Sequence, residues 1–205
     1  MLNYKQIKEI IALKSSVPEG QEGDWRVEKF IIDKSGADFH NLREAIHGRG
    51  RTIESGNYTR LMRNNTLVMS DTYSEKNDSR SFLYNAKGDV LINGLGLGWT
   101  VEACLHIPEV EQITVVEISE DVIKLVGVYL QNKYGKDRLR IINYDALKYC
   151  PPKNKIYDAV WHDIWDNICG DNWESMKKLH RKYGKRSKWQ GSWCREEVRY
   201  ANKRY

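Results

Sequence analysis

The 205-residue sequence lacks the features that define several large classes of protein. It has no run of about 18 apolar residues, so we expect no membrane-spanning helix. Its N-terminus lacks the apolar core of a signal peptide, and no internal repeat or low-complexity tract is present. The four cysteines form no C-x-x-C pair, and the histidines show no ligand spacing. We therefore expect reduced thiols, no metal site and a cytoplasmic protein.

The composition is that of a folded domain with an uneven charge. Hydrophobic residues make up 40% of the chain, and the length suits one domain or one domain with a small appendage. The formal charge is +5, but residues 175–205 alone carry eleven Lys/Arg against two Glu. This basic end is suited to contact nucleic acid or an acidic protein, and a solvated face of two short helices explains it equally well.

The first part of the chain, residues 1–86, is predicted to form a small α+β appendage. A short helix is expected from Asp38, as its N-cap, to Gly48 as its stop. Two alternating segments then meet at Asn64-Asn65, and asparagine tolerates the positive φ that a tight hairpin turn needs. The appendage should therefore contain a β-hairpin.

The second part, residues 87–205, has the pattern of an α/β domain. Apolar runs alternate with helical segments, and the runs are DVLING, QITVVEI, LRIINYD, YDAVWHD and a short fifth, SKWQGSWC. Continuous apolar strands separated by helices indicate a parallel sheet covered on both faces. One of the helices should begin at Asp171 and end at Gly184. Ligands of such sheets bind at the carboxyl ends of the strands.

A glycine-rich turn follows the first of these strands. Gly94, Gly96 and Gly98 allow a sharp turn and a close approach of a ligand to main-chain N–H groups. Glu117 ends the next strand, where a carboxylate can accept hydrogen bonds from both ribose hydroxyls of an adenosine. Trp99 occupies the third glycine position of the dinucleotide fingerprint, so the pattern favours S-adenosylmethionine or a relative. A tight turn without a ligand is the alternative.

Further acids follow the next two strands. Asp145 can accept the adenine amino group, with Ala146 leaving room for the ring, and it can also cap the segment that follows. Asp163 and Asp166 follow the fourth strand and can hold and orient a cationic amine. Trp165, between them, can wall an acceptor pocket. The alternative for the pair is that one caps a helix and the other is solvated.

Residues 66–193 resemble the spermidine synthase (aminopropyltransferase) branch of the class I methyltransferase fold. The resemblance lies in TLVMSDTYSEKND, VVEISEDVIKLV, YDAL, YDAVWHDIWDN and KWQGSW, in that order. It implies a Rossmann-like, mostly parallel sheet that stops after the fifth strand. It also implies that Glu117 holds ribose and Asp145 adenine, and that Asp163 orients or deprotonates the acceptor. Asp166 and Gln190 would line the acceptor pocket.

The resemblance also bears on which of several functions we expect. The glycine loop of the family usually contains an acid that contacts the propylamine end of the donor, and Leu97 lies in that region here. We therefore expect methyl transfer from S-adenosylmethionine to an amine or another small nucleophile. Aminopropyl transfer from decarboxylated S-adenosylmethionine is one alternative. A nucleic-acid methyltransferase using the basic end, with Trp189 and Trp193, is another, and a non-catalytic adenosyl-binding protein is a third. The resemblance further implies a homodimer formed through the N-terminal part.

Overall fold

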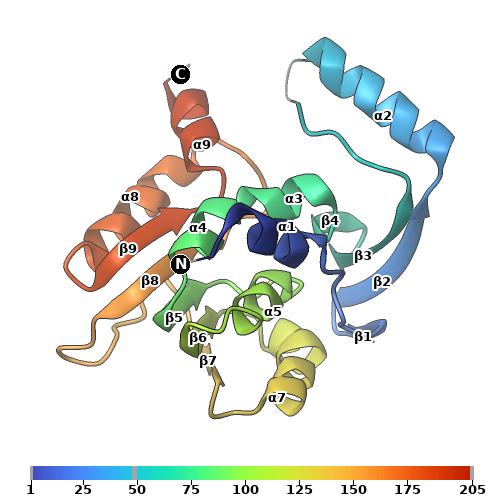
Figure 1. Ribbon diagram of the computed structural model, residues 1–205. Coiled ribbons are helices and arrows are strands. Elements are labelled where there is room, and N and C mark those ends of the chain that lie inside the picture. Colours follow the sequence, from blue (N-terminus) through green and yellow to red (C-terminus); the bar gives the residue numbers. More distant parts are fainter. Residues whose placement is uncertain (1, 48–49, 204–205) are drawn as a thin grey trace.

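The computed structural model describes residues 2–47 and 50–203, and the strands in these ranges form two sheets (Figure 1). The smaller sheet is antiparallel, with the order β1-β2-β3-β4. Its strands are β1 (Gly20–Glu22), β2 (Trp25–Ile32), β3 (Gly56–Arg63) and β4 (Thr66–Ser70). Asn64 has a φ of 52° between β3 and β4, which confirms the predicted hairpin turn.

The larger sheet is parallel throughout, with the order β7-β6-β5-β8-β9. Its strands are β5 (Gly88–Asn93), β6 (Val110–Glu117), β7 (Leu139–Asn143), β8 (Tyr157–His162) and β9 (Ser187–Ser192). The predicted parallel α/β sheet of five strands is thus confirmed. The chain leaves β5 on one side toward β6 and returns on the other side with β8, so the switch point lies at the carboxyl end of β5.

Helices cover both faces of the parallel sheet, as continuous apolar strands require. The elements on or beside the sheet are α3 (Tyr73–Asp78), α4 (Arg80–Asn85), α5 (Trp99–Leu105), α6 (Glu120–Val122), the π-helical turn η1 (Ile123–Gly127), α7 (Val128–Tyr134), α8 (Asn172–Tyr183) and α9 (Arg195–Asn202). Val90 and Trp161 pack on the side of α4 and α5. Leu91 and Val160 face the opposite side, where Leu179 of α8 covers them.

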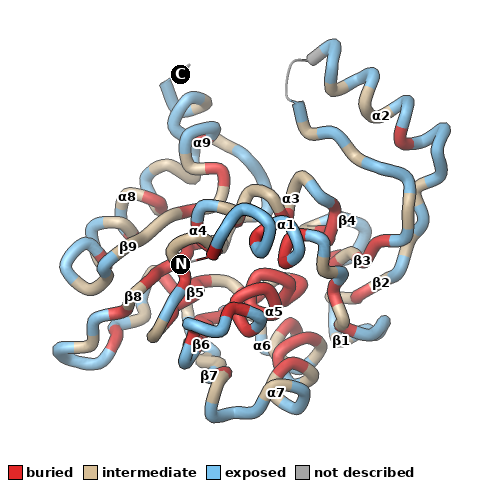
Figure 2. The backbone as a smooth tube through the Cα atoms, in the orientation of Figure 1, coloured by how far each residue is buried: buried red, intermediate tan, exposed pale blue. Residues whose placement is uncertain are grey.

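The appendage and the α/β domain share one hydrophobic core. Ile7 and Ile11 of α1 (Tyr4–Ala12) are fully buried in the same cluster as Trp161 of β8. Phe82 of α4 stacks on Trp161 with a ring-centroid distance of 5.3 Å. Figure 2 shows the buried backbone concentrated around β5, α5 and the neighbouring strands. The division at residues 86 and 87 therefore remains a prediction, because a continuous core spans it.

One helix begins earlier than predicted. Helix α2 (Lys34–His47) starts four residues before Asp38, so the N-cap assignment of Asp38 is wrong. Asp33, directly after β2, takes that role, because its carboxylate accepts a hydrogen bond from the N–H of Gly36 at 2.6 Å. The predicted stop, Gly48, lies outside the described residues. Asp171 does precede α8, although its side chain makes no capping hydrogen bond.

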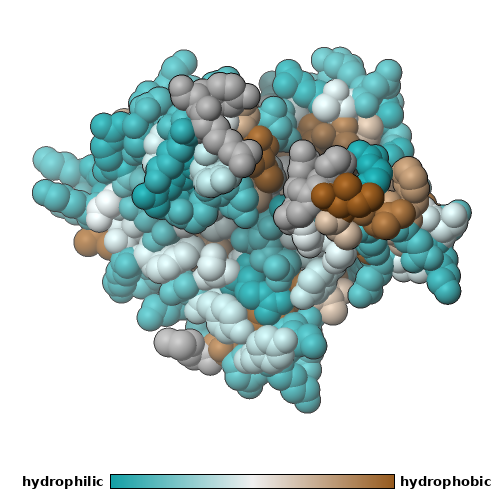
Figure 3. Space-filling view, turned by 90° about the horizontal axis from the view of Figure 1, so that it is seen from above, coloured by the Kyte–Doolittle hydropathy of each residue, from teal (hydrophilic) through white to brown (hydrophobic). Residues whose placement is uncertain are grey.

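Helix α2 extends away from the body of the molecule (Figure 1). Phe39, Leu42 and Ile46 on this helix are 60–72% exposed. Figure 3, which views the molecule from above, shows hydrophobic side chains gathered on the side where α2 lies. The homodimer remains a prediction. Within the described ranges, no helix is long and apolar enough to cross a membrane.

Candidate active site

A cavity of about 570 Å³ lies at the carboxyl ends of the parallel strands, beside the switch point. The loops after β5, β6, β7 and β8 form its floor, and side chains of β3 and β4 contribute from the smaller sheet. The cavity volume is within the range typical of small-molecule sites. Eight of the ten sequence-predicted site residues line it: Gly94, Gly96, Glu117, Asp145, Ala146, Asp163, Trp165 and Asp166.

The glycine turn brings the ends of β5 and β8 into close contact. Gly94 has a φ of 96°, and a Cβ built on it would lie 1.9 Å from the backbone carbonyl oxygen of Asp163. No side chain fits at that position. Gly98 also has a positive φ, of 77°, but it begins α5 and packs against Val126 and Leu130. It does not line the cavity, so its role is in packing the helix.

Glu117 is fixed with its carboxylate toward the glycine turn. One carboxylate oxygen accepts the N–H of Leu95 at 2.7 Å, and the other accepts the N–H of Ser119 at 2.8 Å. The residue is only 8% exposed, and burial raises its pKa. A carboxylate oxygen can accept a second hydrogen bond, so both oxygens remain able to accept ribose hydroxyls. Ile118 is 70% exposed and lines the cavity beside it, an apolar surface that the sequence interpretation did not identify.

Both interpretations of Asp145 are compatible with the structure. Its side chain accepts the N–H of Leu147 at 2.8 Å, which is the capping role, and it lines the cavity as well. Lys182 of α8 fixes the backbone of the turn that follows Asp145. Its ammonium donates to the carbonyl oxygens of Ala146, Leu147 and Tyr149 at 3.0, 2.8 and 2.9 Å. Lys182 is therefore a positioning residue of this turn that sequence reasoning missed.

Asp163 directly follows β8, and its backbone N–H donates to the carbonyl of Asn93 at 2.8 Å. Burial raises the pKa of its carboxyl to about 7, and the negative charges of Asp78, Glu75 and Asp166 act in the same direction. Asp166 lines the cavity in an exposed position. A carboxyl with a pKa near neutrality in a cleft is suited to exchange a proton with a bound ligand.

Trp165 and Gln190, both predicted to contact the acceptor, lie in different places. Trp165 lines the cavity, and its indole N–H donates to the hydroxyl of Ser175 at 2.8 Å. Gln190 does not line the cavity. Its amide donates to the carbonyl of His180 at 3.0 Å, and its oxygen lies 3.3 Å from Nε2 of His162. Gln190 thus belongs to a network on the α8 side of the sheet.

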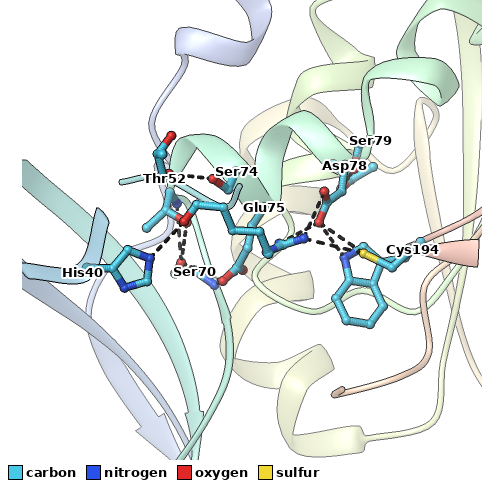
Figure 4. Close-up of polar contacts among 12 residues, drawn as sticks. His40, Thr52, Ser70, Ser74, Glu75, Asp78, Ser79 and Cys194 are labelled. Atoms are coloured by element: carbon cyan, nitrogen blue, oxygen red, sulfur yellow. Dashed lines mark hydrogen bonds and ion pairs between the residues drawn. The ribbon is translucent and has the colours of Figure 1, made fainter. Parts of the chain in front are cut away.

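A cluster of charged residues at another edge of the cavity was not identified from the sequence (Figure 4). Arg51 and Glu75 both line the cavity. The Arg51 guanidinium binds the carboxylate of Asp78, with nitrogen–oxygen distances of 2.8 and 3.3 Å. The same carboxylate accepts the indole N–H of Trp193 at 3.1 Å and the thiol of Cys194 at 3.5 Å. Segments distant in sequence meet here, so no local pattern predicts the cluster.

The charged groups that line the cavity are mainly acidic. The five acids are Glu75, Glu117, Asp145, Asp163 and Asp166, and the cations are Arg51 and Arg63. Such a lining favours a ligand that carries positive charge. Among the described residues, no group of three or more His, Cys, Asp or Glu side chains is placed to hold a metal ion.

Part of the basic end has contacts within the fold. Besides Lys182, Arg186 donates to the carbonyl oxygens of Pro151 and Pro152, and Lys188 pairs with Asp158 at 2.6 Å. Lys182 and Arg186 connect α8 and the turn after it to the loop that precedes β8, and Lys188 connects β9 to β8. They explain part of the local excess of positive charge without a nucleic acid.

Comparison with known proteins identifies the family. Residues 78–182, about half of the chain, match the family described as the spermine/spermidine synthase domain. The chain therefore belongs to this family. It is 33% identical over 125 residues to a polyamine aminopropyltransferase of Prochlorococcus marinus strain MIT 9515, a match that covers 56% of this chain and 44% of the relative. It is 32% identical over 85 residues to polyamine aminopropyltransferase 2 of Hyperthermus butylicus, a match that covers 40% of this chain and 28% of the relative.

The chain thus spans less than half the length of these two curated relatives. Solved structures with partial similarity include an S-adenosylmethionine-dependent methyltransferase from Clostridium acetobutylicum, with 15% identity, a TM-score of 0.40 and coverage of 53% of this chain and 42% of that one. A dimethyladenosine transferase from Plasmodium falciparum has 20% identity and a TM-score of 0.39, with coverage of 52% of this chain and 34% of that one.

Proposed function

We propose that this protein transfers the aminopropyl group of decarboxylated S-adenosylmethionine to an amine acceptor. The observation that carries the proposal is the acidic cavity at the switch point, because a sulfonium donor with an ammonium tail and an amine acceptor are all cationic. The names of the relatives support aminopropyl transfer over methyl transfer. This revises the expectation from the sequence, in which methyl transfer came first.

The cavity has the parts that an adenosyl donor needs. Glu117 is oriented by two backbone N–H groups and can receive the ribose hydroxyls. Asp145 and Ala146 border the place for adenine, and Ile118 offers an apolar surface for its ring. Gly94 keeps the floor free of side chains. These residues would bind the donor and fix its orientation.

The reaction is a displacement at carbon. The acceptor nitrogen forms a bond to the carbon attached to sulfur, the carbon–sulfur bond breaks, methylthioadenosine leaves, and the nitrogen loses a proton. The donor supplies the electrophilic carbon, so the protein needs mainly to align the acceptor and exclude water. An alkylamine has a pKa of about 10. Asp163, with its pKa raised to about 7, would hold the amine and take its proton as the bond forms.

Methyl transfer from S-adenosylmethionine is the second candidate, and two observations favour it. Leu97 is fully buried, so the glycine turn presents no acid to the cavity. Arg63 lines the cavity and is the kind of residue that holds a carboxylate, which only the undecarboxylated donor carries.

Product analysis separates these candidates. The purified protein is incubated with each donor and a set of linear diamines, and the nucleoside products are identified by mass spectrometry. Aminopropyl transfer yields methylthioadenosine and a lengthened amine, whereas methyl transfer yields S-adenosylhomocysteine. The variant Asp163→Asn should bind the donor and lose turnover. Product from S-adenosylmethionine alone would replace the first proposal with the second, and donor binding without product from any diamine would support a binding protein.

A further inference from the structure

We propose that Glu75 binds the terminal ammonium of the aminopropyl donor. This inference rests on the proposed function and assigns a donor-binding role to a residue outside the family match at residues 78–182. It follows from the order of the residues along the cavity, from the charges around Glu75 and from the chemistry of the donor tail.

A series of contacts connects the glycine turn to Glu75. The turn begins beside Glu117, whose carboxylate accepts the N–H of Leu95 at 2.7 Å. Two residues further, the N–H of Leu97 points to the sulfur of Met69 at 3.1 Å. The next residue, Ser70, contacts the Glu75 carboxylate. A donor with its ribose at Glu117 and its sulfur over the turn would thus direct its tail toward Glu75.

The carboxylate of Glu75 is held in a fixed position. Ser70 holds it with two hydrogen bonds, from the backbone N–H at 2.6 Å and from the hydroxyl at 3.0 Å. Among the residues that the structure describes, no ion pair involves Glu75, because the guanidinium of Arg51 binds Asp78 instead. Figure 4 shows Glu75 between Ser70 on one side and Asp78 on the other. Burial raises the pKa of Glu75, whereas the hydrogen bonds from Ser70 and the charge of Arg51 favour its ionised form. A cationic group bound beside it would favour the ionised form further.

The other acids of the cavity have different positions. Glu117 lies at the start of the glycine turn, and Asp145 borders the turn after β7. Asp163 and Asp166 follow β8 and line the part of the cavity that the proposed function gives to the acceptor. The charge of Glu75 contributes to the raised pKa of Asp163, so the donor tail and the acceptor would bind near each other. Leu97, within the glycine turn itself, is buried and apolar. Among these acids, Glu75 is the one that β4 connects to the glycine turn, through Met69 and Ser70, and we place the end of the three-carbon tail and its ammonium there.

Calorimetric titration with two ligands tests this assignment. Decarboxylated S-adenosylmethionine carries the ammonium tail, whereas methylthioadenosine shares the adenosyl group but lacks the tail. The variant Glu75→Gln retains an oxygen that can accept from Ser70 and loses the charge. We expect it to bind decarboxylated S-adenosylmethionine about tenfold more weakly or worse, with unchanged affinity for methylthioadenosine. Glu111→Gln, on the exposed start of β6, controls for the change of net charge.

A second variant separates ligand binding from a structural role of Glu75. Ser70→Ala removes the hydroxyl contact and leaves the carboxylate charge, so we expect an affinity for decarboxylated S-adenosylmethionine close to that of the wild type. If Ser70→Ala weakens this donor as much as Glu75→Gln does, or if Glu75→Gln binds both ligands normally or loses both, the assignment of Glu75 is wrong. If the wild-type protein binds neither ligand, the proposed function itself fails.

Discussion

Asp163 should make the folded protein less stable as the pH rises. Its pKa is raised from an ordinary value of 3.8 to about 7, because burial disfavours the charged form. The penalty is absent below about pH 4, grows as the pH rises to about 7 and is constant above that. Each pH unit in this interval corresponds to about 1.4 kcal/mol, which gives about 4 kcal/mol at pH 8 and about 2 kcal/mol at pH 5.

Replacing this residue by asparagine removes the ionisable group with little change in shape. Asp163→Asn should therefore be more stabilised, relative to the wild type, at pH 8 than at pH 5. The arithmetic gives a difference of about 2 kcal/mol between the two pH values, which we halve to about 1 kcal/mol because the side chain retains some exposure to the cavity. The same variant should lose turnover.

The assay is urea unfolding of both proteins at pH 5 and pH 8, followed by the fluorescence of the seven tryptophans. Asp137→Asn, at an exposed position between α7 and β7, is the matched control and should show no such dependence on pH. An Asp163→Asn variant with the same relative stability at both pH values, or a lower one at pH 8, would refute the argument that burial holds this carboxyl partly protonated.

Three further substitutions test the floor and walls of the cavity. Gly94→Ala should lower the free energy of unfolding by about 3 kcal/mol or more, because a Cβ there meets a carbonyl oxygen at 1.9 Å. The control is Gly135→Ala, at a position with a φ of 88° and no atom within 4 Å of the added Cβ. It should lower the free energy of unfolding by about 1 kcal/mol in the same denaturation experiment. Glu117→Ala should weaken methylthioadenosine binding at least tenfold by calorimetry, by loss of the ribose contacts, and normal binding would contradict that role. Lys182→Met should weaken the same ligand several-fold, because three carbonyls of the adenine turn lose their donor, whereas exposed Lys178→Met should not.

The sequence was sufficient to predict the parallel sheet and much of the cavity, for a geometric reason. Parallel strands place their carboxyl ends at one edge, so Glu117, Asp145 and Asp163, each at or just after a strand, had to come close together. Gly94 could be assigned to the turn because only glycine serves where the backbone has a positive φ and another backbone segment lies against it, here that of Asp163.

Residues outside that edge could not be predicted in the same way. Arg51 and Glu75 reach the cavity from the connection after α2 and from α3, and their positions depend on how the smaller sheet packs against the larger one. Gln190 lies on β9, where alternate side chains face opposite sides of the sheet, and its side chain bonds to His162 and His180. Helix α2 begins earlier than the prediction because Asp33, directly after the strand, accepts the N–H of Gly36 and caps the helix before Asp38 is reached.

A crystal structure with methylthioadenosine is the most direct test of the central claim, that the cavity at the switch point is an adenosyl site. The account predicts ribose hydroxyls on the Glu117 carboxylate, adenine between Ile118 and Ala146, and the methylthio group over the turn at Gly94. A ligand bound elsewhere, or a cavity without ligand at concentrations that saturate related transferases, would contradict it.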